Sequence, residues 1–159
     1  DINFDLGNPI MFVHGWPLNH NMYEYIIEYF ASRGHRCIAI DLRGYGNSDK
    51  PYTGYDYDRM AMDIKLVIDA LKLSDITLVG HSMGGAICLR YMSKFNEDKV
   101  SRLCLLSAVA PKWVQSSNWL YGYTVDEVNK LIDSFKSDKP KAIIDTSESF
   151  FINLLVKVY

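Results

Sequence analysis

Gly80-His81-Ser82-Met83-Gly84-Gly85 joins a predicted β-strand to a predicted α-helix. The strand is the continuously apolar run Ile76–Gly80, and the helix is the pattern from Gly84 to Phe95. A Gly-x-Ser-x-Gly sequence in this position is typical of a nucleophile elbow, a tight turn that lifts the serine hydroxyl out at the end of the strand. The alternative is a chance match, in which the serine only caps an ordinary helix. The flanking strand and helix favour the elbow, with Ser82 as a nucleophile near the positive end of the helix dipole.

Strands and helices alternate on both sides of this junction. Short apolar runs predict four strands: Ile10–His14, Arg36–Asp41, Ile76–Gly80 and Ser101–Ser107. Amphipathic patterns predict three intervening helices: Met22–Arg33, Asp56–Leu73 and Gly84–Phe95. Because the strands are apolar throughout, we expect a mostly parallel sheet flanked by helices, an α/β fold. Right-handed crossovers then bring the carboxyl ends of all strands, and Ser82 with them, to one edge.

Two of the predicted helices indicate which side they bury. In the first, the expected buried face consists of Tyr25, Ile26, Tyr29 and Phe30. In the second, Asp56 is expected to cap the first turn. Its expected apolar stripe consists of Met60, Ile64, Val67, Ile68 and Leu71.

The pattern changes after Ala110-Pro111. Two helical patterns follow without a strand between them, the first opening with the capping box Thr124–Glu127 and the second running from about Pro140 to Tyr159. We therefore expect residues 1–115 to form the sheet-bearing part and residues 116–159 to begin a helical cap or lid.

Composition excludes several classes of protein. The chain has 159 residues, with 17 basic and 19 acidic side chains, so it lacks the positive charge of a nucleic-acid groove. No apolar run approaches the ~18 residues that span a bilayer, and no basic-then-apolar leader is visible. The three cysteines lie in apolar stretches, which predicts buried, reduced thiols and a cytoplasmic location: Cys37, Cys88 and Cys104. None of them is paired at zinc-ligand spacing, so no metal is expected.

A second motif, Val13-His14-Gly15-Trp16-Pro17, ends the first predicted strand. An acyl-transfer site needs two backbone donors that face the developing oxyanion. The amides of Met83 and Trp16 are expected to supply them, and Trp16, Pro17, His81 and Met83 to line the substrate pocket. The alternative is a plain strand end followed by turn residues.

A glycine-rich loop, Asp41–Asp49, follows the second strand. It lacks the Lys-Ser/Thr of a P-loop and does not run directly into a helix, so phosphate binding is disfavoured. We expect Asp41 and Arg43 to form a structural ion pair that shapes this loop.

Together these motifs resemble the α/β-hydrolase superfamily: HGWP at 14–17, DLRGYGNSDKP at 41–51 and GHSMGG at 80–85. Residues 51–58 and Met83 look most like the cofactor-free haloperoxidase/arylesterase-like serine hydrolases, and the likeness covers residues 9–112. The resemblance implies an acyl-serine formed from an ester, lactone or amide, released by water that a histidine activates, with no cofactor. Epoxide hydrolases and haloalkane dehalogenases of this fold carry aspartate where this chain has Ser82. His81 replaces the usual phenylalanine of haloperoxidase-like members, which favours plain esterase activity.

The partners of such a serine do not follow it here. The family order is serine, acid, histidine, whereas all four histidines lie at or before the elbow: His14, His20, His35 and His81. We expect none of them to be the base, although His20 is expected near the pocket mouth. The later aspartates are predicted to be solvated: Asp126, Asp133, Asp138 and Asp145. The triad acid and histidine are therefore expected outside this chain, as in the N-terminal part of a longer hydrolase, and 159 residues alone are expected to be inactive.

The leading hypothesis is a serine hydrolase of small carboxylic esters or lactones, with Ser82 as nucleophile. One alternative is a non-catalytic module that binds a small ligand or partner, and another is a cofactor-free haloperoxidase or perhydrolase. The expected partners are a small-molecule substrate and neither nucleic acid nor membrane. A complementing C-terminal segment or a second copy is expected to cover the apolar edge at Ser101–Ser107.

Overall fold

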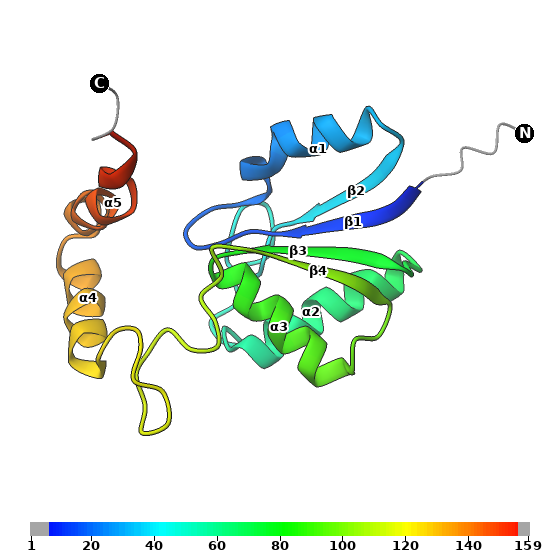
Figure 1. Cartoon of the computed structure of the whole chain (residues 1–159). Helices are drawn as coiled ribbons and strands as arrows, with labels where there is room; N and C mark the ends of the chain where they lie inside the picture. Colours follow the sequence, from blue (N-terminus) through cyan, green and yellow to red (C-terminus); the bar gives the residue numbers. More distant parts are fainter. Residues whose placement is uncertain (1–6, 156–159) are drawn as a thin grey trace, which may run out of the picture. The chain divides into compact units, whose positions relative to one another are not determined.

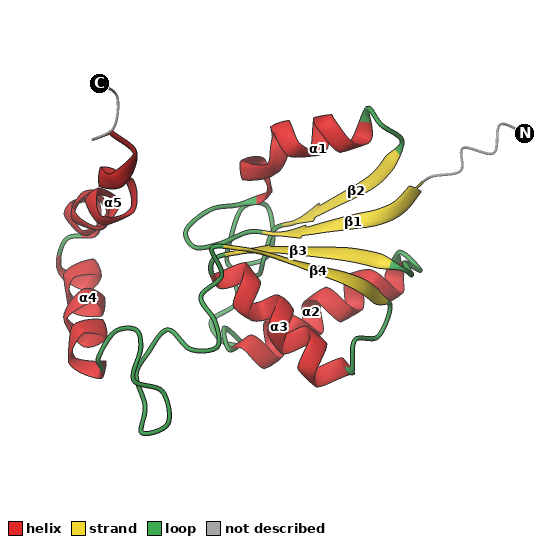
Figure 2. Ribbon diagram, viewed as in Figure 1, coloured by secondary structure: helices red, strands yellow, loops and turns green. Residues whose placement is uncertain are grey.

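The computed structural model describes residues 7–155, with side chains described up to residue 147. Contacts divide it into two compact units, Asp1–Pro111 and Lys112–Tyr159. The first unit contains one four-stranded sheet, drawn in yellow in Figure 2, with the order β2-β1-β3-β4. Its strands are β1 (Gly7–Val13), β2 (His35–Ile40), β3 (Ile76–His81) and β4 (Val100–Leu106). Every neighbouring pair is parallel, which confirms the predicted α/β class.

The helices of the first unit lie on both faces of the sheet (Figure 1). A 3₁₀ turn, η1 (His20–Tyr23), leads into α1 (Glu24–Ala31), which lies on one face. The other face carries α2 (Tyr57–Ala70) and α3 (Met83–Phe95). The chain steps from β1 to β2 in one direction and returns across β1 to β3 in the other. Right-handed crossovers in opposite directions place α1 and α2 on opposite faces.

The buried apolar cluster is larger on the face of the sheet that α2 and α3 cover. Successive residues of β1 point to opposite faces, and Met11 and Val13 belong to the cluster under α2 and α3. The larger cluster also contains Ile64, Ile68, Leu78, Ile87 and Tyr91, all fully buried. On the α1 side, the buried cluster consists of Ile10, Phe12, Tyr23 and Val79. The main apolar core therefore lies between the sheet and the two helices α2 and α3, the second of which begins directly after Ser82.

The predicted buried face of the first helix is partly wrong. Tyr25 is 79% exposed, Tyr29 53% and Ile26 39%, and of the four predicted residues only Phe30 packs against the cluster on this face. Tyr23 instead anchors this region, because its ring is buried and its hydroxyl donates to Val13 O at 3.0 Å. The α-helix begins only at Glu24, after the 3₁₀ turn, and it packs mainly beside β2, so none of its own residues is fully buried.

The predicted stripe of α2 is confirmed except at its end. Met60, Ile64 and Ile68 are buried and Val67 packs against them, whereas Leu71 lies beyond the last helical residue and is 40% exposed. Asp56 caps the helix as predicted, with its carboxylate accepting from Arg59 N at 2.9 Å.

The second unit contains α4 (Val125–Ser137) and α5 (Lys139–Leu155). The predicted capping box of α4 is present: Thr124 Oγ1 accepts from Glu127 N at 3.2 Å, and the Glu127 carboxylate accepts from Thr124 N at 2.7 Å. The last four residues of the second predicted helix, 156–159, lie outside the described residues. Within residues 7–155, no helix is both long and apolar enough to cross a membrane.

The three cysteines are free thiols in different environments. Cys88 is buried and Cys37 is half-buried, but Cys104 is exposed, so the prediction of three buried thiols is wrong for Cys104. The cause is its position on β4, which has only β3 as a neighbour in the described sheet.

Candidate active site

Ser82 occupies the sharp turn between β3 and α3, as the motif predicts. Its backbone has φ 51° and ψ −119°, a conformation that a residue with a side chain rarely adopts. Such a conformation is worth about 1–3 kcal/mol of strain and needs surrounding structure to hold it. That structure is visible: Ser82 N donates to Leu106 O at 3.0 Å, and Ser82 O accepts from Gly85 N at 3.0 Å and Val109 N at 3.1 Å. The end of β4 therefore clamps the elbow.

Two glycines make the turn sterically feasible. A Cβ on Gly80 would lie 2.6 Å from Gly85 Cα, where strand and helix meet. A Cβ on Gly84 would overlap Val13 O and lie 2.5 Å from His14 O. Because these neighbours are backbone atoms, they cannot move aside. The first turn of α3 consequently lies directly against the end of β1.

The Ser82 hydroxyl is not used as a helix cap. Serine at this position usually accepts a hydrogen bond from the second or third helical N–H, yet the Ser82 side chain makes no capping bond. The amide of Met83 is the first of α3 and therefore has no acceptor within the helix. A hydroxyl beside such an amide, at the positive end of a helix dipole, is suited to forming an anionic intermediate.

The loop from Gly15 to Asn19, here called the oxyanion loop, passes against this elbow. Gly15 is buried, and a Cβ added to it would lie 2.9 Å from Ser82 Cβ and 2.8 Å from His81 Nδ1. Inside the loop, Leu18 N donates to Gly15 O at 2.9 Å. Trp16, whose side chain is 38% exposed, follows Gly15 directly. Gly15, the residue before Trp16, thus lies against Ser82, and Met83 follows Ser82 in the chain; the role of the two amides as oxyanion donors stays a prediction.

His14 is fully buried at the start of the oxyanion loop. Its Nε2 accepts from Leu42 N at 3.0 Å, so the proton of the neutral ring is on Nδ1, which lies 2.9 Å from Gly15 O and donates to it. Burial lowers the pKa of His14, which keeps this tautomer neutral. Both ring nitrogens are occupied, so His14 orders the loop and is not available as a base.

His81 is also unsuited to the role of base. Burial lowers its pKa, and its Nδ1 is buried with no hydrogen-bond partner among the described residues. That nitrogen faces the tightly packed Gly15. His35 is the first residue of β2, so it lies at the opposite edge of the parallel sheet from Ser82.

The expected ion pair between Asp41 and Arg43 is wrong. Asp41 pairs with His20, whose Nδ1 lies 2.8 Å from Asp41 Oδ1. Arg43 turns to α2 and binds Asp63 through Nε at 2.5 Å and Nη2 at 2.7 Å. Both residues follow the end of β2, where the regular alternation of a strand no longer applies, and Asp41 faces the oxyanion loop while Arg43 faces α2. His20 and Asp41 are 21 residues apart, and no local sequence signal links them.

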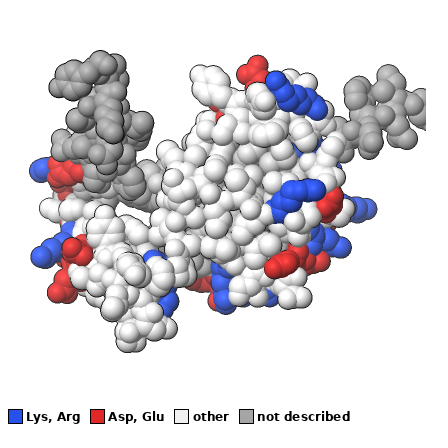
Figure 3. All heavy atoms as spheres, in the orientation of Figure 1, with Lys and Arg blue, Asp and Glu red and all other residues white. Residues whose placement is uncertain are grey.

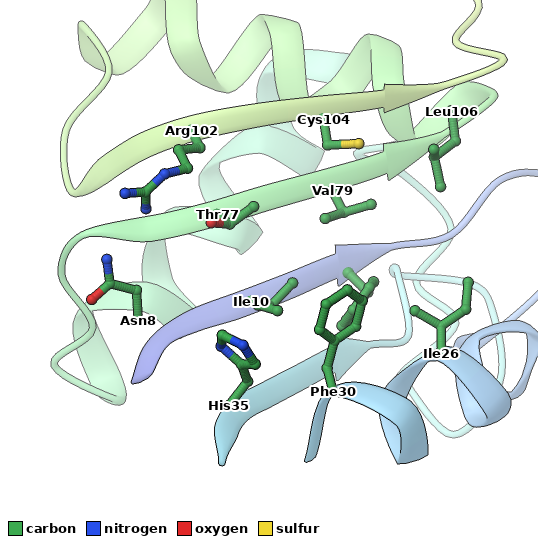
Figure 4. A pocket seen from close by; sticks show the side chains of 11 residues that line it. Asn8, Ile10, Ile26, Phe30, His35, Thr77, Val79, Arg102, Cys104 and Leu106 are labelled. Carbon is green, nitrogen blue, oxygen red and sulfur yellow. The ribbon is translucent and has the colours of Figure 1, made fainter. Parts of the chain in front are cut away.

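A hollow of 640 Å³ lies elsewhere, on the sheet face that α1 covers only in part. In Figure 4, side chains from β1, β3, β4 and α1 point into it, including Val79, Cys104, Leu106 and Phe30. Polar side chains lie toward one end, where Arg102, Asn8 and His35 are labelled. None of the four predicted pocket residues lines it. In Figure 3, charged side chains gather mostly toward the margins of the visible surface.

Within the described residues, no group of three His, Cys, Asp or Glu side chains could hold a metal ion.

Comparison with known proteins gives consistent matches. A model of the alpha/beta hydrolase fold family matches residues 8–156. The AB hydrolase superfamily protein YisY of Bacillus subtilis (strain 168) is 48% identical over 145 residues, 91% of this chain and 54% of that protein. Non-heme chloroperoxidase CPO-A1 of Kitasatospora aureofaciens is 34% identical over 145 residues, 91% of this chain and 53% of that protein.

A solved structure matches as well. The esterase EaEST from Exiguobacterium antarcticum superimposes with a TM-score of 0.85 at 47% identity, covering 89% of this chain and 53% of that chain. The chain therefore spans about half the length of the relatives it matches.

Proposed function

Because the chain belongs to the alpha/beta hydrolase fold family, we propose that it carries the nucleophile of a serine hydrolase acting on small carboxylic esters or lactones. The observation that carries the proposal is the conformation of Ser82 between β3 and α3. Its backbone has a positive φ, and its hydroxyl makes no hydrogen bond that caps α3. Such strain persists only where the surrounding structure imposes it, and it clusters at active sites. The similarity to the esterase EaEST supports the ester as substrate class.

In the proposed reaction, Ser82 Oγ attacks the carbonyl carbon of the substrate while a general base takes the hydroxyl proton. The carbonyl oxygen becomes an oxyanion, which the N–H groups of Met83 and Trp16 stabilise. As this intermediate collapses, the base returns its proton to the leaving oxygen, which departs as the alcohol of an ester or remains as the hydroxyl of an opened lactone. The acyl-serine that is left is then hydrolysed by water. Both ring nitrogens of His14 are occupied, His35 lies at the opposite edge of the sheet, and the buried Nδ1 of His81 faces Gly15. His20 donates to Asp41 through Nδ1, and no hydrogen bond joins its ring to Ser82 among the described residues. We therefore place the base and its acid in the complete protein outside these 159 residues.

A second candidate is perhydrolysis, favoured by the similarity to the non-heme chloroperoxidase CPO-A1. In that reaction the same acyl-serine would be released by hydrogen peroxide in place of water, giving a peracid. The two candidates share Ser82 and differ only in the acceptor of the acyl group. Peracid formation from an acetate ester and hydrogen peroxide, compared with hydrolysis of the same ester, separates them.

Intact mass after treatment with a fluorophosphonate probe tests the nucleophile. We expect one adduct on the complete protein, none on Ser82→Ala, and an unchanged adduct on Ser93→Ala, a matched control at an exposed serine of α3. An unlabelled complete protein would support the rival reading, a binding module without turnover. An adduct that survives Ser82→Ala would place the nucleophile elsewhere.

Turnover of p-nitrophenyl acetate tests the missing base. We expect the complete protein to hydrolyse it and the 159-residue chain to show little or no turnover. Robust turnover by the 159-residue chain would show that one of its four histidines serves as the base.

A further inference from the structure

The oxyanion loop is tied at both of its ends to the carboxyl end of β2. At the start of the loop, His14 Nε2 accepts from Leu42 N at 3.0 Å. After the loop, His20 N and His20 Nδ1 both lie 2.8 Å from Asp41 Oδ1. An ionised carboxylate only accepts hydrogen bonds, so both nitrogens of His20 donate. Two consecutive residues, Asp41 and Leu42, thus hold the two ends of one short loop.

Asp41 is built for this contact. Its side chain is 7% exposed, and its second oxygen, Oδ2, accepts from Asn47 N at 2.8 Å. Burial acts to raise the pKa of Asp41, but the hydrogen bonds from Asn47 and His20 lower it to about 2. The carboxylate is therefore charged throughout the neutral range. Hydrogen bonds to a charged acceptor are roughly twice as strong as those between neutral groups.

The oxyanion loop carries the backbone N–H of Trp16, the proposed oxyanion donor, whose position relative to Ser82 affects the reaction rate. Gly15 lies against Ser82, and the next amide is that of Trp16. An oxyanion donor has to lie within hydrogen-bond distance of the place where charge develops, and a shift of about 1 Å lowers a reaction rate by about 100-fold. Exposed residues occupy the middle of the loop, since Trp16, Pro17 and Leu18 are all exposed. The hydrogen bonds at its two ends therefore contribute to its geometry, together with the bond from Leu18 N to Gly15 O inside it.

We propose that Asp41 is a positioning residue for the oxyanion hole, because its carboxylate holds His20 and thereby fixes the loop that presents Trp16 N–H beside Ser82. The inference rests on the proposed function, since an oxyanion hole requires an acylated serine. We call the hydrogen-bonded pair of His20 and Asp41 the clasp. Neither side chain acts on the substrate itself.

A comparable ion pair provides the control. Arg43 and Asp63 join the same β2–α2 connection to α2, with two hydrogen bonds at 2.5 and 2.7 Å. The Asp63 contacts that the described part of the chain shows are to Arg43 and Arg59, not to the oxyanion loop. Loss of this pair lowers stability without releasing the loop.

The experiment uses the complete protein and compares Asp41→Asn, His20→Leu and His20→Asn with Asp63→Asn. Hydrogen exchange by mass spectrometry reports on residues 15–21, and hydrolysis of p-nitrophenyl acetate gives kcat and KM. Asp41→Asn and His20→Leu are expected to speed exchange in this segment and to lower kcat about 10-fold or more, with KM within about twofold. His20→Asn carries an amide N–H near the position of Nδ1 and is expected to recover most of the loss.

Asp63→Asn is expected to leave both readouts close to wild type while lowering the midpoint of urea unfolding. The inference is overturned if exchange in residues 15–21 is unchanged in both Asp41→Asn and His20→Leu, or if kcat falls no further than in Asp63→Asn. A wild-type protein without esterase turnover contradicts the proposed function instead, so the two failures are distinguishable. His20→Leu keeps the test decisive if Asp41→Asn does not fold, because His20 is partly exposed.

Discussion

Ser82 and the residues around it show how a local pattern and a distant contact combine. The Gly-x-Ser-x-Gly spacing predicts the turn, because each glycine removes a Cβ that would collide with backbone atoms. The clamp on that turn comes from Leu106 and Val109, more than twenty residues further along the chain. The pairing of His20 with Asp41 is likewise a contact between residues far apart in the chain. The predicted pair of Asp41 with Arg43 was wrong because residues close in sequence were assumed to be partners.

We predict that Gly84→Ala destabilises the complete protein by about 3 kcal/mol, because the added methyl group meets Val13 O and His14 O, which are backbone atoms. Gly34→Ala is the control: Gly34 has φ +85° but no atom within 4 Å of the added Cβ, so only backbone strain of about 1 kcal/mol applies. Urea unfolding measures both free energies. Equal losses of unfolding free energy in the two variants would show that steric crowding at Gly84 does not contribute to stability.

We predict that His14 makes the protein less stable in mild acid. Its folded-state pKa lies below 6.5, so the unfolded chain binds a proton first. The free energy of unfolding therefore falls as the pH drops from about 6.5 toward the folded-state pKa, and this contribution is complete above about 6.5. Asp41, His20 and Tyr45 face His14 and remain in the variant.

His14→Gln tests this prediction, because its side-chain oxygen can accept from Leu42 N without titrating. Urea unfolding at about pH 7.5 and about pH 5 is expected to show a smaller loss of stability in the variant than in the wild type. His81, whose pKa is also lowered by burial, titrates in both proteins and cancels in the comparison. Identical losses would contradict the role given to His14.

The helices show where periodicity predicts packing and where it fails. α2 follows one regular period from its cap at Asp56, so its buried stripe was predicted almost completely. Tyr25 and Tyr29 lie inside α1, where the helical period is regular, yet both are exposed. α1 packs mainly beside β2 and buries none of its residues completely, so an apolar face alone does not predict how much of it is covered.

We predict that Asp56→Ala destabilises the protein by about 1 kcal/mol, because Arg59 N loses its acceptor at the first turn of α2. Asp56→Asn is the matched control, since asparagine caps about as well as aspartate, and it is expected to change stability little. Thermal unfolding of the two variants measures the difference. If Asp56→Asn proves as harmful as Asp56→Ala, the charge matters rather than the cap.

The described chain builds its core mainly on one side of the sheet. Under α2 and α3 the sheet is covered, but α1 packs mainly beside β2, and near β4 the other face carries the hollow and the exposed Cys104. Parallel sheets are ordinarily covered on both faces, and the chain spans about half the length of its relatives. We therefore expect the hollow beside β4 to be filled in the complete protein, by further chain or by a second copy.

Thiol labelling tests this expectation. Cys104 lines the hollow and is exposed, so it is predicted to react rapidly with a disulfide reagent in the 159-residue chain and slowly in the complete protein. Cys88 is the internal control, because it is buried and its thiol pKa is raised by burial. Protection of Cys88 shows that the shorter chain is folded. Equal reactivity of Cys104 in both proteins would mean that this face stays open.

Residue order alone was enough for the α/β class, the strand and helix sequence, the elbow at Ser82 and the caps at Asp56 and Thr124. Each of these depends on periodicity or on residues within a few positions of one another. Three-dimensional packing was needed for the clasp of His20 with Asp41, the one-sided core and the exposure of Cys104. These depend on which elements become neighbours, and a contact between residues far apart in the chain leaves no periodic trace in the sequence.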